Sequence, residues 1–179
     1  MISYIALLRG INVGGQKKVP MAELRVALSA LAFKNIHTYI QSGNVVFESS
    51  EKDTSILEVK IFSSIKKQFG FEVPVLVKTN LEMKAIFRAC PFSEKKKVSS
   101  YFTLLNSAPE KELIDSLNTV AFDDEEIVAT RNVVYFFSEK GYGKAKCNTN
   151  FIERKLKVTA TTRNYKTMIK LLELSETKL

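Results

Sequence analysis

The longest early run of apolar residues extends from Tyr4 to Leu8 without a polar interruption. Such a run is typical of a strand that is covered on both faces of its sheet. A glycine-bearing loop and Pro20 follow. The helix predicted behind Pro20 ends near Phe33 and has one apolar face at intervals of three and four residues, formed by Met21, Leu24, Leu28 and Leu31.

Two strands at 36–41 and 45–48 are joined through Ser42, Gly43 and Asn44, which predicts an antiparallel hairpin. Asp53 is placed to cap a second helix that ends before Gly70, and a fourth strand follows at 73–78. The order through residue 78 is therefore βαββαβ. It predicts a ferredoxin-like subdomain at 1–78, with two helices on one face of a four-stranded antiparallel sheet.

A connecting helix and charged loop are predicted at 79–97, the helix opening with a capping box of Thr79 and Glu82. Residues 98–179 then form a second α+β subdomain of βαββ type, with strands at 98–105, 126–130 and 133–137 and a helix at 109–117. Two basic C-terminal helices complete it, the first capped by Asn150 and Glu153 and the last by Thr162. The two halves show no obvious sequence similarity, so a duplication is inferred from element order alone.

The composition predicts an ordinary soluble, cytoplasmic protein. A chain of 179 residues that is 45% hydrophobic buries enough surface to fold without disulfides or metals. No leader peptide and no membrane span is indicated. Cys90 and Cys147 are expected to be reduced thiols, and a single histidine does not build a zinc site. We therefore predict no metal site, and the sequence identifies no cofactor.

The net charge of +8 is concentrated at the C-terminal end of the chain. Residues 140–179 contain 10 Lys and Arg against 3 Asp and Glu, whereas residues 1–139 contain 17 against 16. This asymmetry favours an anionic partner, either a phosphorylated small molecule or nucleic acid. The alternative is a basic segment that serves only solubility.

The loop after the first strand has the residues of an anion cradle. Glycine amides at Gly14 and Gly15, before a helix N-terminus, suit a phosphate, and Arg9, Asn12 and Lys17 would complete the site. The spacing matches neither GxGxxG nor a P-loop, so a tight turn with solvated lysines is the alternative. Asn44 has a similar choice between a role in the hairpin turn and a bond to a ligand.

A second basic region lies near the C-terminus. Lys144 and Lys146 belong to a glycine-bearing loop, and Arg163 and Asn164 lie where the last helix is predicted to begin. Basic residues at a helix N-terminus oppose its dipole, so either a bound anion or a carboxylate from elsewhere in the chain is expected there. We further predict that both basic loops serve one anion site.

Three segments carry a family resemblance: YIALLRGINVGGQKKVPMAE at 4–23, TYIQSGNVVF at 38–47 and FIERKLKVTATTRNYKTMIKLLEL at 151–174. The chain resembles the bacterial family catalogued as domain of unknown function 1697. The resemblance implies an α+β fold with a ferredoxin-like portion and assigns no reaction. Family members often have Ser where Ala145 stands and Trp where Tyr165 stands.

Binding of a phosphate-bearing small molecule, such as a nucleotide, is the function that the sequence favours. The loops supply Arg, Lys, Asn and Gly but no recognisable pair of nucleophile and base. A small hydrolase or transferase acting on a phosphorylated or acylated substrate is one alternative. The others are nucleic-acid binding and an interaction module without a ligand.

Overall fold

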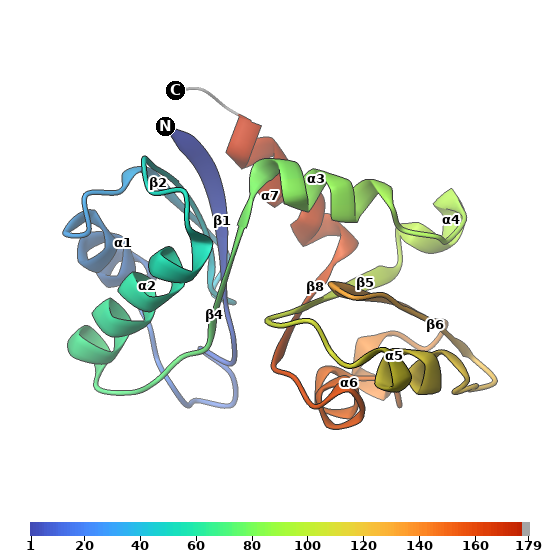
Figure 1. Ribbon diagram of the computed structural model, residues 1–179. Helices are drawn as coiled ribbons and strands as arrows, with labels where there is room; N and C mark the ends of the chain where they lie inside the picture. The colour runs from blue at the N-terminus through green and yellow to red at the C-terminus, as the bar shows by residue number, and fades with distance from the viewer. Residues whose placement is uncertain (177–179) are drawn as a thin grey trace. The chain divides into compact units, whose positions relative to one another are not determined.

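The computed structural model describes residues 1–176 and divides them into two compact units (Figure 1). The first unit is Met1–Ala85 with the chain from Lys170 onward, and the second is Ile86–Ile169. The division therefore falls inside two helices, α3 (Asn80–Arg88) and α7 (Tyr165–Glu176). The predicted α+β class is confirmed. No helix within 1–176 is both long enough and apolar enough to cross a membrane.

The first unit has a four-stranded sheet in the order β2-β3-β1-β4, with every neighbouring pair antiparallel. The strand β1 lies inside this sheet, as its continuous apolar run predicts. The elements follow the predicted βαββαβ order: β1 (Ile2–Leu8), α1 (Met21–Ser29), β2 (Lys34–Tyr39), β3 (Asn44–Ser49), α2 (Thr54–Phe69) and β4 (Val75–Thr79).

Both helices of this order cover the same face of the sheet (Figure 1). Leu24 and Leu28 of α1 pack in one core cluster with Leu57, Ile61 and Ile65 of α2, against Tyr4, Ala6, Leu8 and Phe47 of the sheet. Each fully buried Leu or Ile contributes about 1.5–3 kcal/mol. The ends of α2 are as predicted, because Asp53 accepts the N–H of Ser55 at 2.9 Å and Gly70 adopts φ 79°.

The second unit has its own antiparallel sheet, in the order β6-β7-β5-β8. A short helix α4 (Glu94–Lys97) precedes it, and a 3₁₀ turn η1 (Tyr142–Lys144) follows its third strand. The remaining elements are β5 (Ser100–Leu105), α5 (Lys111–Asn118), β6 (Glu125–Ala129), β7 (Val133–Ser138), α6 (Thr149–Leu156) and β8 (Ala160–Asn164).

The strand β8 corrects the prediction that two helices follow one another at the C-terminus. Residues 160–164 pair with β5, so Thr162 does not cap a helix, and its hydroxyl lies 2.8 Å from that of Thr103. Asn164 caps α7 instead, accepting the N–H of Thr167 at 2.9 Å. The cap of α6 is Asn148 rather than Asn150. Pairing with β5 satisfies the backbone groups on one side of residues 160–164, and the β-branched threonines suit a strand.

With β8 in place, the two units repeat the same internal geometry. Tyr4 pairs with Phe47 and Thr79 in the first sheet, and Tyr101 pairs with Phe136 and Asn164 in the second. The Tyr–Phe rings stack in both, with centroids 5.6 and 5.2 Å apart. Thr79 caps α3 as Asn164 caps α7. The repeated order is therefore βαββαβα, one strand and two helices longer than the predicted βαββ repeat.

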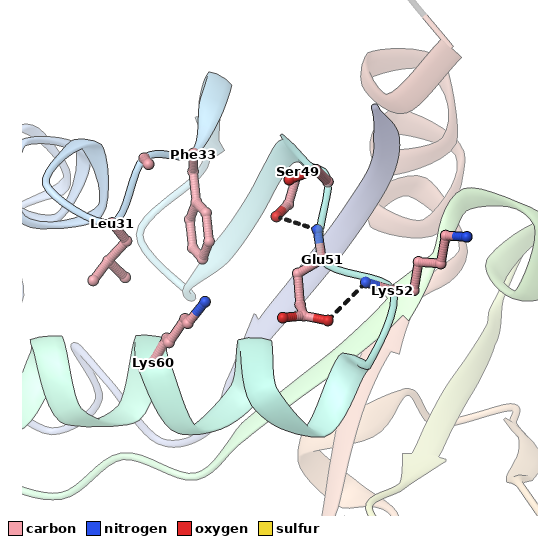
Figure 2. A pocket seen from close by; sticks show the side chains of 8 residues that line it. Leu31, Phe33, Ser49, Glu51, Lys52 and Lys60 are labelled. Carbon is pink, nitrogen blue, oxygen red and sulfur yellow. Dashed lines mark hydrogen bonds between the residues drawn. The ribbon is translucent and has the colours of Figure 1, made fainter.

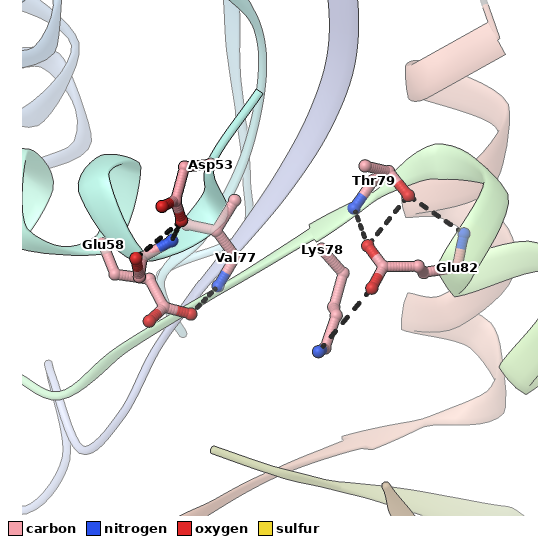
Figure 3. Close-up of polar contacts among 7 residues, drawn as sticks. Asp53, Glu58, Val77, Lys78, Thr79 and Glu82 are labelled. Carbon is pink, nitrogen blue, oxygen red and sulfur yellow. Dashed lines mark hydrogen bonds and ion pairs between the residues drawn. The ribbon is translucent and has the colours of Figure 1, made fainter. Parts of the chain in front are cut away.

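Carboxylates bind backbone N–H groups on one edge strand of each sheet. Figure 3 shows Glu58 of α2 accepting the N–H of Val77 on the edge strand β4, at 2.8 Å, and Glu82 accepting that of Thr79, also at 2.8 Å. In the second unit, Glu153 of α6 accepts the N–H of Ala160 on the edge strand β8 at 2.8 Å. Glu58 and Glu153 occupy the same helical position, five residues after the caps Asp53 and Asn148.

Candidate functional site

The glycines of the first loop form a tight turn at its tip. The N–H of Gln16 donates to the carbonyl of Val13 at 3.1 Å, and Gly14 and Gly15 between them adopt φ 58° and 76°. Two successive residues with positive φ are what a two-residue type I′ turn requires, and glycine adopts them without steric cost. This geometry supports the turn interpretation of Gly14 and Gly15.

Asn12 holds the loop together through its side-chain amide. Its Nδ2 donates to the carbonyls of Val19 at 3.0 Å and Gln41 at 2.8 Å, and its Oδ1 accepts the N–H of Val19 at 2.8 Å. Both amide protons are therefore used inside the protein. Lys17 Nζ donates to the carbonyl of Glu72 at 2.8 Å. Arg9 is half-buried, and its N–H donates to the carbonyl of Pro74 at 3.0 Å.

Asn44 is fully buried at the start of β3. Its Nδ2 donates to the carbonyl of Tyr39 at 3.0 Å and to Ser42 Oγ at 2.9 Å. These bonds close the β2–β3 connection, which favours the turn role of Asn44 over a role in ligand binding.

The second basic loop is anchored by a buried carboxylate. Glu125, at the start of β6, accepts the N–H groups of Lys146 at 2.7 Å and Cys147 at 2.8 Å. The side chains of Lys144 and Lys146 are exposed. The N–H groups of Lys146 and Cys147 are therefore already bound by a carboxylate of the protein itself.

A chain of hydroxyl groups fixes the start of the same loop. Tyr142 Oη lies 2.6 Å from Thr149 Oγ1, which lies 2.6 Å from Thr162 Oγ1, which in turn lies 2.8 Å from Thr103 Oγ1. The N–H of Tyr142 also donates to Tyr101 Oη at 3.1 Å. The loop is thereby attached to β5, β8 and the first turn of α6.

Arg163 lies on β8, where its Nη1 donates to the carbonyl of Thr162 at 2.8 Å. Burial lowers the pKa of its guanidinium to about 10, against the opposing effect of nearby Tyr142. The side chain still carries its positive charge at neutral pH. Asn164 follows at the end of the strand, where it is exposed.

A pocket of about 330 Å³ lies at the end of the second sheet, near this loop. Its lining comes from the start of β5, the end of β7 with the following loop, and the β8–α7 junction: Val98, Ser99, Ser100, Tyr101, Ser138, Glu139, Gly141, Asn164, Tyr165 and Lys166. The pocket thus brings Gly141 of the basic loop together with Asn164. Its volume is at the lower end of the range for small-ligand sites.

Two lining residues have polar groups suited to an anion. Ser138 is 3% exposed, and its Oγ has no hydrogen-bond partner in the part of the chain that the structure describes. Lys166 lies in the first turn of α7 and makes no ion pair with any residue described between 1 and 176. Glu139 adds an exposed carboxylate at the rim.

The candidate residues thus separate into two groups. Arg9, Asn12, Gly14, Gly15, Lys17 and Asn44 belong to the first unit, and Lys144, Lys146, Arg163 and Asn164 to the second. That both groups serve one anion stays a prediction. Sequence reasoning missed Ser138, because a serine at the end of a strand belongs to no motif; its signal is its place on the alternating face of Val134 and Phe136.

Comparison with known proteins places the chain in a family. The family described as "Protein of unknown function (DUF1697)" matches residues 1–135. The chain belongs to DUF1697. The match includes all elements from β1 to β6 and ends within β7. In this DUF1697 protein, Ser138 and the β8–α7 junction therefore lie beyond the matched residues.

A solved structure extends the comparison over the remaining residues. The DUF1697 chain is similar to a conserved bacterial protein from Streptococcus pneumoniae, with 25% sequence identity and a TM-score of 0.77. The similarity covers 98% of this chain and 99% of that one. No curated protein matches the sequence. The fold of the DUF1697 chain is thus shared along nearly its whole length.

Proposed function

We propose that the protein binds a small phosphate-bearing molecule at the pocket formed by β5, β7 and the β8–α7 junction. The observation that carries the proposal is the buried hydroxyl of Ser138, which has no partner among residues 1–176. A buried hydroxyl without a partner costs about 1–3 kcal/mol. A phosphate oxygen that accepts from Ser138 removes this cost on binding.

The charges around the pocket support an anion as the ligand. Lys166 places a cation in the first turn of α7, where the helix dipole already favours negative charge. Glu139 provides an acceptor for a hydroxyl or amine elsewhere on the ligand. A phosphorylated metabolite or a nucleotide has both kinds of group, so we favour these over inorganic phosphate. Because both cysteines are free and buried, we place this activity in the cytoplasm.

Thermal unfolding with and without AMP tests the proposal. A ligand at about one hundred times its Kd stabilises the folded state by about 2.7 kcal/mol, which corresponds to a rise in Tm of several degrees. Ser138→Ala is the decisive variant. It should leave the unliganded protein equally or more stable, because it removes an unpaired buried hydroxyl, yet it should abolish most of the ligand-dependent rise.

Lys166→Gln should also reduce the rise in Tm that AMP produces. Lys34→Gln on β2 is the matched control, because it removes an exposed positive charge away from the pocket, and it should leave this rise unchanged. A full rise in Tm with Ser138→Ala would exclude this pocket. A rise produced by an oligonucleotide but not by AMP, and lost between about 50 and 200 mM salt, would indicate nucleic-acid binding instead.

A further inference from the structure

A groove of about 520 Å³ runs between α1 and α2 on the side away from the core of the first unit. Small side chains form much of its lining: Ala27 and Ala30 from α1 and its C-terminal end, and Ser63 and Ser64 from α2. Ser64 Oγ donates to the carbonyl of Ala27 at 3.3 Å, which joins the two helices. Small residues allow the backbone of another helix to approach closely.

Exposed apolar side chains lie on both helices beside this groove. Val26 on α1 is 73% exposed, and Val59 and Ile56 on α2 are 64% and 42% exposed. Val26 is one turn from Ala30, and Ile56 is one turn from Lys60. Single exposed apolar residues are ordinary, but here Val59 lines the groove, and Val26 and Ile56 lie one turn from lining residues on the two helices.

The charged side chains that line the groove are both cationic. They are Lys60 and Lys67, and neither makes an ion pair with any residue in the described range 1–176, whereas the neighbouring Lys66 pairs with Glu72 at 2.8 Å. The groove therefore combines an apolar border with unneutralised positive charge.

A second hollow continues the groove past the C-terminal end of α1. It measures about 450 Å³ and shares Leu31 and Lys60 with the groove (Figure 2). Figure 2 shows Lys60 reaching from α2 into this hollow, with Lys52 beyond it. The carboxylate of Glu51 in the hollow is engaged, because it accepts the N–H groups of Lys52 and Asp53. Lys60 thus contributes positive charge to both the groove and the hollow, where Lys52 and the Glu51 carboxylate also form part of the lining.

We propose that this groove docks an acidic amphipathic helix of a partner protein. Its apolar face would pack against Val26, Val59 and Leu31, and its carboxylates would pair with Lys60 and Lys67. The stretch of α2 from Ile56 to Gln68 is about 18 Å long, which matches about three turns of a helix. A concave groove with a small-residue lining fits a helix better than a flat membrane surface.

Titration of the ¹⁵N-labelled full chain with a synthetic amphipathic peptide of Leu, Ala and Glu tests the inference. We expect saturable amide shifts confined to α1, α2 and the hollow. Lys60→Glu combined with Lys67→Glu should raise the Kd about tenfold or more, as loss of about 1.4 kcal/mol requires. Ala30→Leu should also weaken binding, because leucine is a good helix former and its larger side chain narrows the groove. Lys18→Glu, outside the groove, should leave the Kd unchanged.

A peptide with Lys in place of Glu should not bind. Equal binding of both peptides, shifts outside the groove or an unchanged Kd in the double variant would each overturn the inference. So would shifts of the same amides with anionic phospholipid vesicles and none with the acidic peptide. The groove and the proposed phosphate pocket share no residue, so each proposal can fail without the other.

Discussion

Glu58 Oε1 accepts the backbone N–H of Val77 at 2.8 Å, which joins helix α2 to the edge strand β4 (Figure 3). Burial raises the pKa of this carboxyl group above its ordinary value of 4.5. The negative charge of Asp53 raises it further, while the bond from Val77 and the charge of Lys78 lower it. Burial is the largest of these effects, so the ionised carboxylate costs stability although it is hydrogen-bonded.

Glu58→Gln is expected to flatten the pH dependence of stability in mildly acidic solution. With a raised pKa, the folded state binds the proton more tightly than the unfolded state. The contribution of Glu58 to the free energy of unfolding therefore falls as pH rises from 4.5 through the folded pKa. Gln keeps an acceptor for Val77 without a charge. Urea unfolding from about pH 4 to 7 measures the effect.

Glu58→Ala is the matched control, because it removes the acceptor as well as the charge. It should lower stability by about 1–3 kcal/mol at neutral pH, since the N–H of Val77 loses its partner. An unchanged pH profile in Glu58→Gln would contradict the assignment of this dependence to Glu58.

Gly43 is expected to tolerate no side chain. A Cβ at this position would lie 2.6 Å from Leu8 Cβ and 2.9 Å from Ile11 Cδ1, and the backbone has φ 78°. Gly43→Ala should therefore cost more than the roughly 1–2 kcal/mol of a left-handed backbone alone. Gly15→Ala is the control, since its φ is 76° but its Cβ would meet open space. If chemical denaturation showed that both variants lose a similar free energy of unfolding, the close approach of Gly43 to Leu8 would have no effect.

Glu125→Ala is expected to expose Cys147 to thiol reagents. Glu125 holds the N–H groups of Lys146 and Cys147, and burial, aided by Glu125, raises the pKa of the Cys147 thiol to about 12. The buried thiol should react slowly in the parent protein. In a Cys90→Ser background, the labelling rate at slightly alkaline pH should rise with Glu125→Ala and remain low with Glu126→Ala. Equal rates would show that Glu125 does not hold the loop closed.

Asn118→Ala is expected to loosen the edge strand β6. The Asn118 amide donates to the carbonyl of Ala129 at 3.0 Å and accepts its N–H at 2.7 Å, as a neighbouring strand would. Loss of both bonds should lower the free energy of unfolding by about 1 kcal/mol or more. Asn132→Ala in the exposed β6–β7 turn should have a smaller effect. Comparable urea midpoints for the two variants would refute the role of Asn118.

The first unit follows from the sequence because its signals are local and agree. Each local signal specifies one element and is compatible with no other: the apolar run specifies β1, the cap at Asp53 specifies the start of α2, and the residues around Gly43 specify a turn. The strand β8 had no such signal. Thr161, Thr162 and Arg163 are polar, and a threonine before a helix also suits an N-cap. Residues 161–163 pair with β5, which is distant in sequence, and the hydrophobic periodicity of a segment does not indicate its partners.

The repeat of the two units did leave a trace in the sequence. Tyr4 to Leu8 reads YIALL and Tyr101 to Leu105 reads YFTLL, at equivalent positions of β1 and β5. Tyr4 and Leu8 belong to the core cluster of the first unit, and Leu105 with the partly buried Tyr101 to that of the second, while Leu7 and Leu104 are also buried. A similarity of three residues in five is detectable only once the registers are known. The pocket at Ser138 was missed for a related reason, because it joins three strand ends that are distant in sequence.

The hydrogen bonds and the bulge at the sheet edges also affect how this protein can pair with strands of other chains. Helix carboxylates bind backbone N–H groups of the edge strands β4 and β8, and the Asn118 amide of α5 binds the edge strand β6. The remaining edge strand, β2, has a register shift between Lys34 and His37, with Asn35 at φ 49°. A bulged or capped edge is a poor template for an incoming strand. Neither sheet therefore offers a ready start for fibril growth or for strand addition by a partner, and recognition falls to the helices and loops.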